Sequence, residues 1–100
     1  MRVISKRTLE RAWTAHADAK GPLDAWYATV SAASWAKWVE VQADYPTADR
    51  VGKRIVFNIK GNKYRLIVGY HFPSGVLYVK WFGTHAEYDK IDVATVEYDK

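Results

Sequence analysis

Residues 54–83 read RIVFNIKGNKYRLIVGYHFPSGVLYVKWFG, and the spacing of their apolar side chains decides the fold. Apolar and other side chains alternate with a period of two, as they do in β-strands. The strands are expected at residues 54–59, 63–71 and 76–83, with turns at 60–62 and 72–75. In the first turn Gly61 and Asn62 can adopt the positive φ that a tight hairpin needs. The stretch therefore predicts three antiparallel strands in succession.

The alternation also assigns side chains to the two faces of this sheet. Arg65 is expected mid-strand, on the face opposite to that of Tyr64 and Leu66, so that its charge reaches a groove and not the core. Lys80 is expected to share a face with Tyr78 and Phe82. The opposite face of that strand is expected to carry Leu77, Val79 and Trp81.

The N-terminal part of the chain predicts a short strand over residues 2–4 and two helices after it. Ser5 is expected to cap the first helix, and apolar residues then recur at helical spacing. Gly21 and Pro22 end that helix and open the second, which is expected to continue to about Trp38. Residues 39–53 are expected to form a connecting loop. The core is expected to contain Trp13, Trp26, Trp35 and Trp38.

These elements predict an α+β fold, with two N-terminal helices packed on a small, mainly antiparallel β-sheet. One hundred residues suit a single domain, taken as residues 1–100. The chain contains no cysteine, which excludes disulfides and thiolate metal sites. It shows no signal peptide and no apolar run of membrane-spanning length. We therefore expect a cytoplasmic protein that needs neither cofactor nor metal and has no membrane partner.

Positive charge is concentrated in the predicted strands. The net charge is +4, and residues 51–80 contain six lysines and arginines and no acid, whereas residues 21–50 hold four acids against two bases. A polyanion-binding face needs such a concentration, although a basic surface can also serve solubility alone. The cations are Lys53, Arg54, Lys60, Lys63, Arg65 and Lys80.

Several groups that can transfer protons follow the last strand, in the stretch THAEYDK of residues 84–90. Thr84 and Glu87 have the spacing of a capping box, so a short helix is expected there. On that helix His85 and Tyr88 are neighbours at i and i+3. Strand pairing is expected to bring Arg54, Arg65 and Lys80 close to one another beside them. An imidazole and a phenol among cations suit cleavage of a phosphodiester by the neighbouring 2′-hydroxyl.

Two motifs in these stretches, N-x-x-G-N-x-Y-R-L and F-G-T-H-x-x-Y-D, resemble the HigB-type toxins of bacterial toxin–antitoxin modules, within the RelE-like group. The resemblance covers essentially the whole chain, including the order of helices and strands. It implies a metal-independent endoribonuclease that cuts messenger RNA, usually on the translating ribosome. It also implies a co-encoded antitoxin, expected to be a HigA-like helix-turn-helix protein. The matching residues are Asn58, Gly61, Asn62, Tyr64, Arg65, Leu66, Gly83, Thr84, His85, Tyr88 and Asp89.

The resemblance implies roles for individual side chains. Arg65 fits the strand arginine that grips the scissile phosphate, and His85 stands where the group supplies a cation or an acid. Tyr88 is a general base or a stacking platform, and Lys80 completes the expected catalytic set. RNA-binding roles are expected for Lys53, Arg54, Lys60, Lys63 and Lys90. Asn58 and Asn62 are expected to shape the turn, and His16 and His71 to be surface or packing residues.

Two other functions fit parts of the pattern. A metal enzyme could use His85, Glu87, Asp89 and Asp92, but a helix turns Glu87 away from His85 and no second cluster lies upstream. A non-catalytic RNA- or ribosome-binding module would need only the basic strands and nearby tyrosines. Growth arrest with cut messages would distinguish the nuclease from the binding module.

Overall fold

The computed structural model describes residues 1–97, so the last three residues of the predicted domain lie outside it. Over the described residues the fold is α+β, as the sequence predicted. In chain order the helices and strands are β1 (Arg2–Ile4), α1 (Lys6–Ala15), a 3₁₀ turn (Ala17–Ala19), α2 (Lys20–Ala32), α3 (Trp38–Asp44), β2 (Asp49–Val51), β3 (Arg54–Ile59), β4 (Tyr64–His71), a 3₁₀ turn (Phe72–Ser74), β5 (Val76–Thr84) and α4 (His85–Tyr88).

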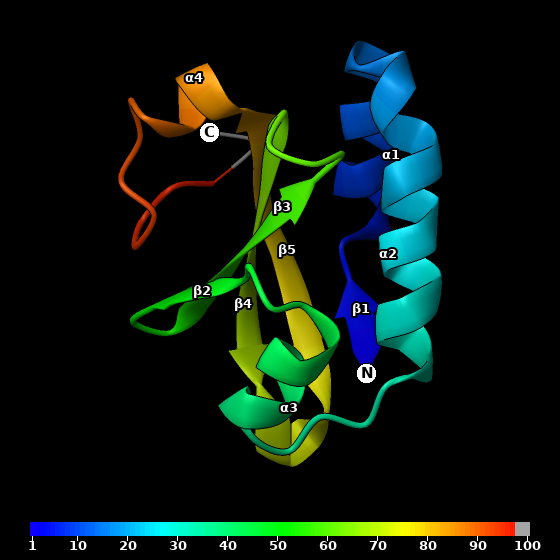
Figure 1. The fold of residues 1–100 in the computed structure, drawn as a ribbon, viewed down its shortest axis with the longest axis vertical. Helices are drawn as coiled ribbons and strands as arrows, with labels where there is room; N and C mark the ends of the chain where they lie inside the picture. Colours follow the sequence, from blue (N-terminus) through cyan, green and yellow to red (C-terminus); the bar gives the residue numbers. More distant parts are fainter. Residues whose placement is uncertain (98–100) are drawn as a thin grey trace.

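Across residues 1–97, five strands form one sheet in the order β1-β5-β4-β3-β2 (Figure 1). The strands β3, β4 and β5 are the predicted antiparallel meander, and β2 adds an antiparallel edge strand. At the other edge β1 pairs parallel to β5, with Val3 opposite Leu77. The sheet is therefore mixed but mainly antiparallel.

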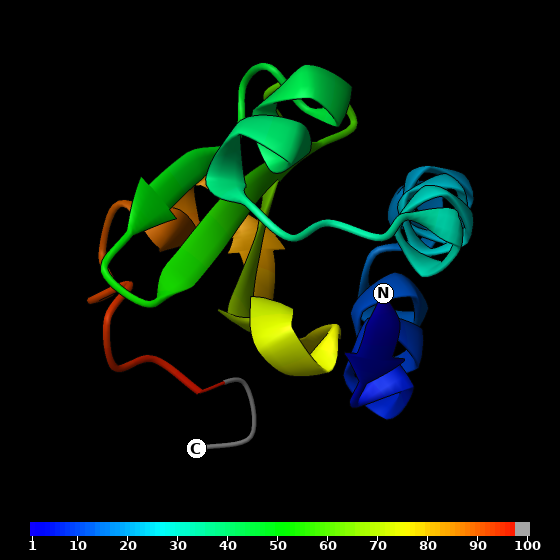
Figure 2. The ribbon, with the colours of Figure 1, turned by 90° about the horizontal axis from the view of Figure 1, so that it is seen from below.

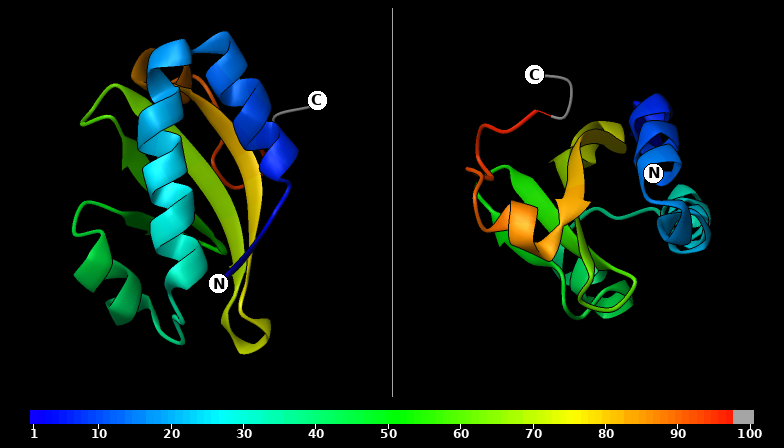
Figure 3. Two further views of the ribbon diagram at one scale, coloured as in Figure 1. Left: turned by 90° about the vertical axis from the view of Figure 1, so that its right-hand side faces the viewer. Right: turned by 90° about the horizontal axis from the view of Figure 1, so that it is seen from above.

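Helices α1 and α2 cover one face of this sheet, and α4 with the C-terminal segment (residues 91–97) covers the other (Figures 2 and 3). The helix-covered face holds the main core, in which Phe57 packs against the rings of Trp26, Trp35 and Tyr45. The largest fully buried side chains of this core are Phe57, Phe82, Leu9, Leu23, Ile55, Leu66, Leu77, Val30, Val41 and Val68. This apolar layer provides most of the buried area that stabilises the fold.

The second face of the sheet carries a much smaller apolar cluster. Its buried members are Val56, Ile67 and Trp81. Tyr88 of α4 and three residues of the C-terminal segment, Ile91, Val93 and Val96, pack over them. The C-terminal segment is thus part of the fold, because it shields this cluster from water.

A β-bulge changes the predicted faces of β5. Ile67 pairs with Trp81 and Val68 with Val79, so Lys80 is the extra residue between them. A bulge places two residues of one strand opposite one of the other and reverses the alternation beyond it. Trp81 therefore joins Tyr78 and Lys80 on the second face, and Phe82 belongs to the main core, contrary to the sequence prediction.

The region between residues 33 and 53 also differs from the prediction. The second helix ends at Ala32 and not near Trp38, and α3 begins at Trp38 and extends through the first part of the expected loop. The carboxylate of Glu40 accepts the N–H groups of Ala36 and Lys37, at 2.8 and 2.9 Å, which starts a new helix and interrupts the old one. The edge strand β2 lies in the same predicted loop.

The remaining expectations for the N-terminal half are confirmed in part. Ser5 stands at the N-cap position of α1, as predicted, but its φ of 74° is left-handed and its side chain makes no capping hydrogen bond. Trp26 and Trp35 are buried, and Trp13 and Trp38 pack against the main core, as predicted. Within residues 1–97, every helix is too short or too polar to cross a membrane.

Candidate active site

Helix α4 is positioned by a capping box and by the turn between β3 and β4. The Thr84 N–H donates to Glu87 Oε1 at 2.8 Å, and the Glu87 N–H donates to Thr84 Oγ1 at 3.1 Å, as the sequence predicted. The backbone N–H of His85 donates to the Lys63 carbonyl oxygen at 3.0 Å. These bonds fix the start of α4 beside the hairpin turn.

The two proton-transfer groups of α4 lie in different surroundings. His85 is exposed, and its Nε2 lies 3.7 Å from Asp89 Oδ1 one turn later. Tyr88 is half-buried against the second face. The guanidinium carbon of Arg65 lies 5.7 Å from the centre of the Tyr88 ring. The structure therefore brings Arg65, His85 and Tyr88 to one end of the sheet.

Arg65 itself is less free than predicted. It is the second residue of β4, not a mid-strand residue, and only 9% of it is exposed. Its Nη2 donates to Asn62 Oδ1 at 2.6 Å, and its Nη1 donates to the carbonyl oxygens of Asn62 and Tyr64, both at 3.2 Å. The guanidinium therefore braces the hairpin turn. The turn-making role predicted for Asn62 is consistent with these bonds.

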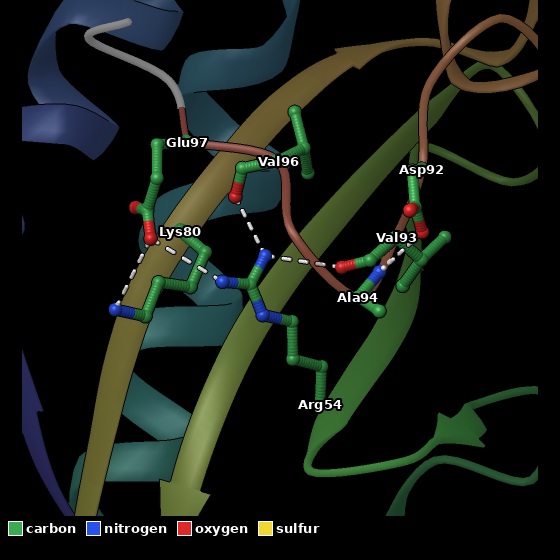
Figure 4. Close-up of polar contacts among 7 residues, drawn as sticks. All are labelled: Arg54, Lys80, Asp92, Val93, Ala94, Val96 and Glu97. Atoms are coloured by element: carbon green, nitrogen blue, oxygen red, sulfur yellow. Dashed lines mark hydrogen bonds and ion pairs between the residues drawn. The ribbon is translucent and has the colours of Figure 1, made fainter.

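Arg54 and Lys80 form a separate site, which Figure 4 shows. The Nη1 of Arg54 donates to the carbonyl oxygens of Val93 and Val96, at 3.0 and 2.6 Å. Glu97 Oε1 lies 3.3 Å from Arg54 Nη2 and 3.6 Å from Lys80 Nζ. Sequence reasoning missed Glu97, because nothing in the local pattern relates it to a strand more than 40 residues earlier.

The expected cluster of Arg54, Arg65 and Lys80 is therefore wrong in its geometry. In the ladder Arg54 is opposite Gly69, whereas Arg65 is opposite Asn58. Four residues of a strand separate Arg65 from Gly69, which is a distance of about 13 Å. Lys80 belongs to the Gly69 end, because the bulge places its side chain there: a Cβ built on Gly69 would lie 3.4 Å from Lys80 Cε.

Two of the predicted RNA-binding lysines meet a third set of partners. Lys60 Nζ lies 3.0 Å from Asp18 Oδ2, and Lys63 Nζ contacts the same oxygen. The Tyr64 hydroxyl donates to Asp18 Oδ1 at 2.5 Å. Hydrogen bonds from Lys63 first, then from Tyr64 and Lys60, hold the pKa of the Asp18 carboxyl far below its ordinary value. The bond to Asp18 likewise raises the pKa of Lys63 and of Tyr64.

The remaining predicted residues are dispersed. Lys53 and Lys90 are both exposed, on the β2–β3 turn and after α4. His16 packs against the rings of Tyr64 and Phe82, and His71 bonds Ser74 Oγ at 2.8 Å, in line with the packing and surface roles expected for them. Among residues 1–97, no three His, Cys, Asp or Glu side chains gather closely enough to hold a metal ion.

Comparison with known proteins gives a consistent result. Residues 19–91 match the HigB toxin family, described as the RelE-like toxic component of a toxin–antitoxin system. The chain is 29% identical over 92 residues to the mRNA interferase toxin HigB of Escherichia coli K12, covering 89% of this chain and 88% of that one. The mRNA interferases HigB of Escherichia coli O157:H7 and Shigella flexneri match to the same extent.

Proposed function

Because the chain belongs to the HigB toxin family, the RelE-like toxic components of toxin–antitoxin systems, we propose that it is an endoribonuclease that cuts messenger RNA and so inhibits translation and growth. The relatives named mRNA interferases support this activity. The observation that carries the proposal is the grouping of Arg65, Tyr88 and His85 at one end of the second face.

The proposed reaction is attack of a ribose 2′-oxygen on the adjacent phosphorus. The P–O5′ bond breaks, which leaves a 2′,3′-cyclic phosphate on one product and a 5′-hydroxyl on the other. We assign Tyr88 to accept or orient the 2′-hydroxyl proton and exposed His85 to protonate the leaving 5′-oxygen, since an imidazole exchanges protons near neutral pH. Arg65 stabilises the charge that develops on the phosphoryl oxygens.

Arg65 can perform this role only with those guanidinium N–H donors that are not already bonded to the hairpin turn. Its three hydrogen bonds to Asn62 and Tyr64 use three of the five N–H donors of a guanidinium. The same bonds preorganise the group, so little side-chain entropy is lost when it meets a phosphate. Lys80, at the other end of the second face, is reassigned from the reaction centre to the RNA backbone. Lys53, Lys60, Lys63 and Lys90 are proposed to bind the backbone as well.

The proposed biological context is the translating ribosome, with a co-encoded helix-turn-helix antitoxin of the HigA type as the silencing partner. The surplus of cations on the sheet supports contact with a phosphate backbone. A neighbouring antitoxin gene and protection from growth arrest by its co-expression would test the partnership.

The activity is tested with His85→Ala and Tyr88→Phe, with His71→Ala as the control because His71 is also exposed but lies at the far end of β4. Single-turnover cleavage of messenger RNA, with and without ribosomes, should slow by roughly 10² to 10⁴ in the first two variants and stay unchanged in the control. Normal rates from folded His85→Ala and Tyr88→Phe would contradict the assignment. RNA binding by a wild-type chain that cuts no RNA at all would instead favour the non-catalytic binding module.

A further inference from the structure

A hollow of about 460 Å³ lies on the second face, away from α4. Gly69 forms part of its lining, and the stem of Lys80 lies across that glycine where a side chain would otherwise stand. The C-terminal segment closes one side through Ala94. The lining residues are Lys53, Arg54, Gly69, Tyr70, Tyr78, Lys80 and Ala94.

The lining combines an exposed ring with cations. Tyr78 is 38% exposed, which is unusual here because most large apolar and aromatic side chains of the described residues are covered. Lys80 Nζ lies 5.8 Å from the centre of the Tyr78 ring. An aromatic platform beside lysines is the arrangement with which proteins hold single-stranded nucleic acid, the base on the ring and the phosphate on the cations.

Two of the cations that line the hollow, Arg54 and Lys80, are already paired with an acid of the chain itself. The Glu97 carboxylate lies between Lys80 Nζ and Arg54 Nη2, as Figure 4 shows. The Nη1 of Arg54 donates to the two carbonyl oxygens of the C-terminal segment, so Arg54 anchors that segment. It contributes positive charge to the hollow, but its guanidinium is not free to bind a phosphate through two parallel hydrogen bonds. Lys80 makes only a longer, 3.6 Å contact, and Lys53 is exposed beside it.

We propose that this hollow is a nucleotide subsite for the RNA substrate, in which Tyr78 stacks on a base while Lys80 and Lys53 bind a phosphate. Glu97 holds the cations in the free chain and is displaced when RNA enters. The inference rests on the proposed function for its ligand. An acidic peptide would use the same cations, but it would give no reason for an exposed ring, so the lining favours a nucleotide.

The test is the affinity of a short, labelled, mixed-sequence RNA with 2′-fluoro sugars, which lacks the attacking hydroxyl. Tyr78→Ala should weaken binding about 5-fold or more, the effect of losing one stacked base, and Tyr78→Phe should bind like the wild type. Glu97→Gln should tighten binding about 2- to 5-fold, the range for an exposed ion pair. Glu10→Gln makes the same change in net charge and serves as its control, because Glu10 is an exposed residue of α1, on the other side of the sheet from the hollow.

Three results would each overturn the subsite: Tyr78→Ala binding like the wild type, Glu97→Gln tightening no more than Glu10→Gln, or no RNA binding at all. Cleavage of the all-ribose form of the same RNA separates this proposal from the nuclease. If the chain cuts RNA but its RNA affinity does not depend on Tyr78, the subsite proposal is wrong and the nuclease proposal stands. If the chain binds RNA through Tyr78 but cuts none, the subsite proposal stands and the nuclease proposal is wrong.

Discussion

The two faces of the sheet are built differently. The helix-covered face buries a continuous apolar layer of aliphatic and aromatic side chains. Among residues 1–97, the apolar cluster of the second face has three buried members, Val56, Ile67 and Trp81, and the same face carries Arg54, Arg65 and other polar groups. The first face stabilises the fold, and the second holds the cations that chemistry on a phosphate would need. Substitutions on the two faces should therefore have different consequences.

The largest effect is expected from Phe57→Ala in the main core. Its ring contacts Trp26 and Tyr45 at centroid distances of 5.4 and 5.1 Å, and the cavity left behind cannot collapse easily between such large groups. We expect the free energy of unfolding to fall by about 3–5 kcal/mol. Chemical denaturation would measure it.

Val96→Ala, in the segment over the second face, is the matched comparison. Its side chain is only half-buried, so the loss should be about 1 kcal/mol or less. Equal losses in the two variants would mean that the second face contributes as much to stability as the main core. The contrast between the faces would then be wrong.

Arg65→Ala should affect both stability and activity. Loss of the phosphate contact should slow cleavage by about 10²-fold. The carbonyl oxygens of Asn62 and Tyr64 would also lose their donor, at a cost of about 1–3 kcal/mol of stability. This cost in stability does not follow from the sequence prediction, which placed the charge in a groove and not in the core.

Single-turnover rates and denaturation of Arg65→Ala and Arg65→Lys would separate the two roles. Lysine retains the charge but has no planar fork for the turn. We expect Arg65→Lys to recover part of the cleavage and little of the stability. A stable Arg65→Ala protein that cuts at the normal rate would remove this residue from the site.

Gly83→Ala tests how tightly the second face is packed. A Cβ at this position would lie 2.4 Å from Trp81 Cη2, so the indole must move. Overpacking of this kind typically costs about 1–3 kcal/mol. Gly21→Ala is the control, since nothing lies within 4 Å of a Cβ there and alanine favours helix. Thermal unfolding should separate the pair, and a neutral Gly83→Ala would show that the indole has room to shift.

The strands were predictable because a period of two is a local property of the chain. The bulge at Lys80 was not, because it depends on how β5 pairs with β4, and it alone exchanges the faces on which Trp81 and Phe82 lie. Helix α3 was missed for a similar reason, since Glu40 caps it from inside a stretch that reads as polar loop.

The candidate site was predictable only in part. His85 and Tyr88 could be found because their spacing on a capped helix is local. The partners of the cations could not, since Asp18 lies 42 and 45 residues from Lys60 and Lys63, and Glu97 lies 43 residues from Arg54. Electrostatic pairs between distant segments leave no periodic signal in a sequence.

The smallest effect is expected from Asp18→Asn, at the contact between the first 3₁₀ turn and the β3–β4 hairpin. The pKa of Asp18 is lowered in the folded chain by Lys63, Tyr64 and Lys60, so the carboxylate stabilises the fold at neutral pH. That stabilisation is fully present above the unfolded pKa of about 3.9 and is lost as the pH falls below it. The melting temperature of the variant should therefore lie below that of the wild type at neutral pH, and this difference in melting temperature should narrow in acid.

Asp24→Asn is the control: its partner Lys20 lies one turn earlier on the same helix at 2.9 Å, and the substitution removes an equal charge. It should cost no more than about 0.5 kcal/mol. A gap for Asp18→Asn that stays constant from neutral pH to below about pH 4 would show that the side chain acts through packing and not through its charge.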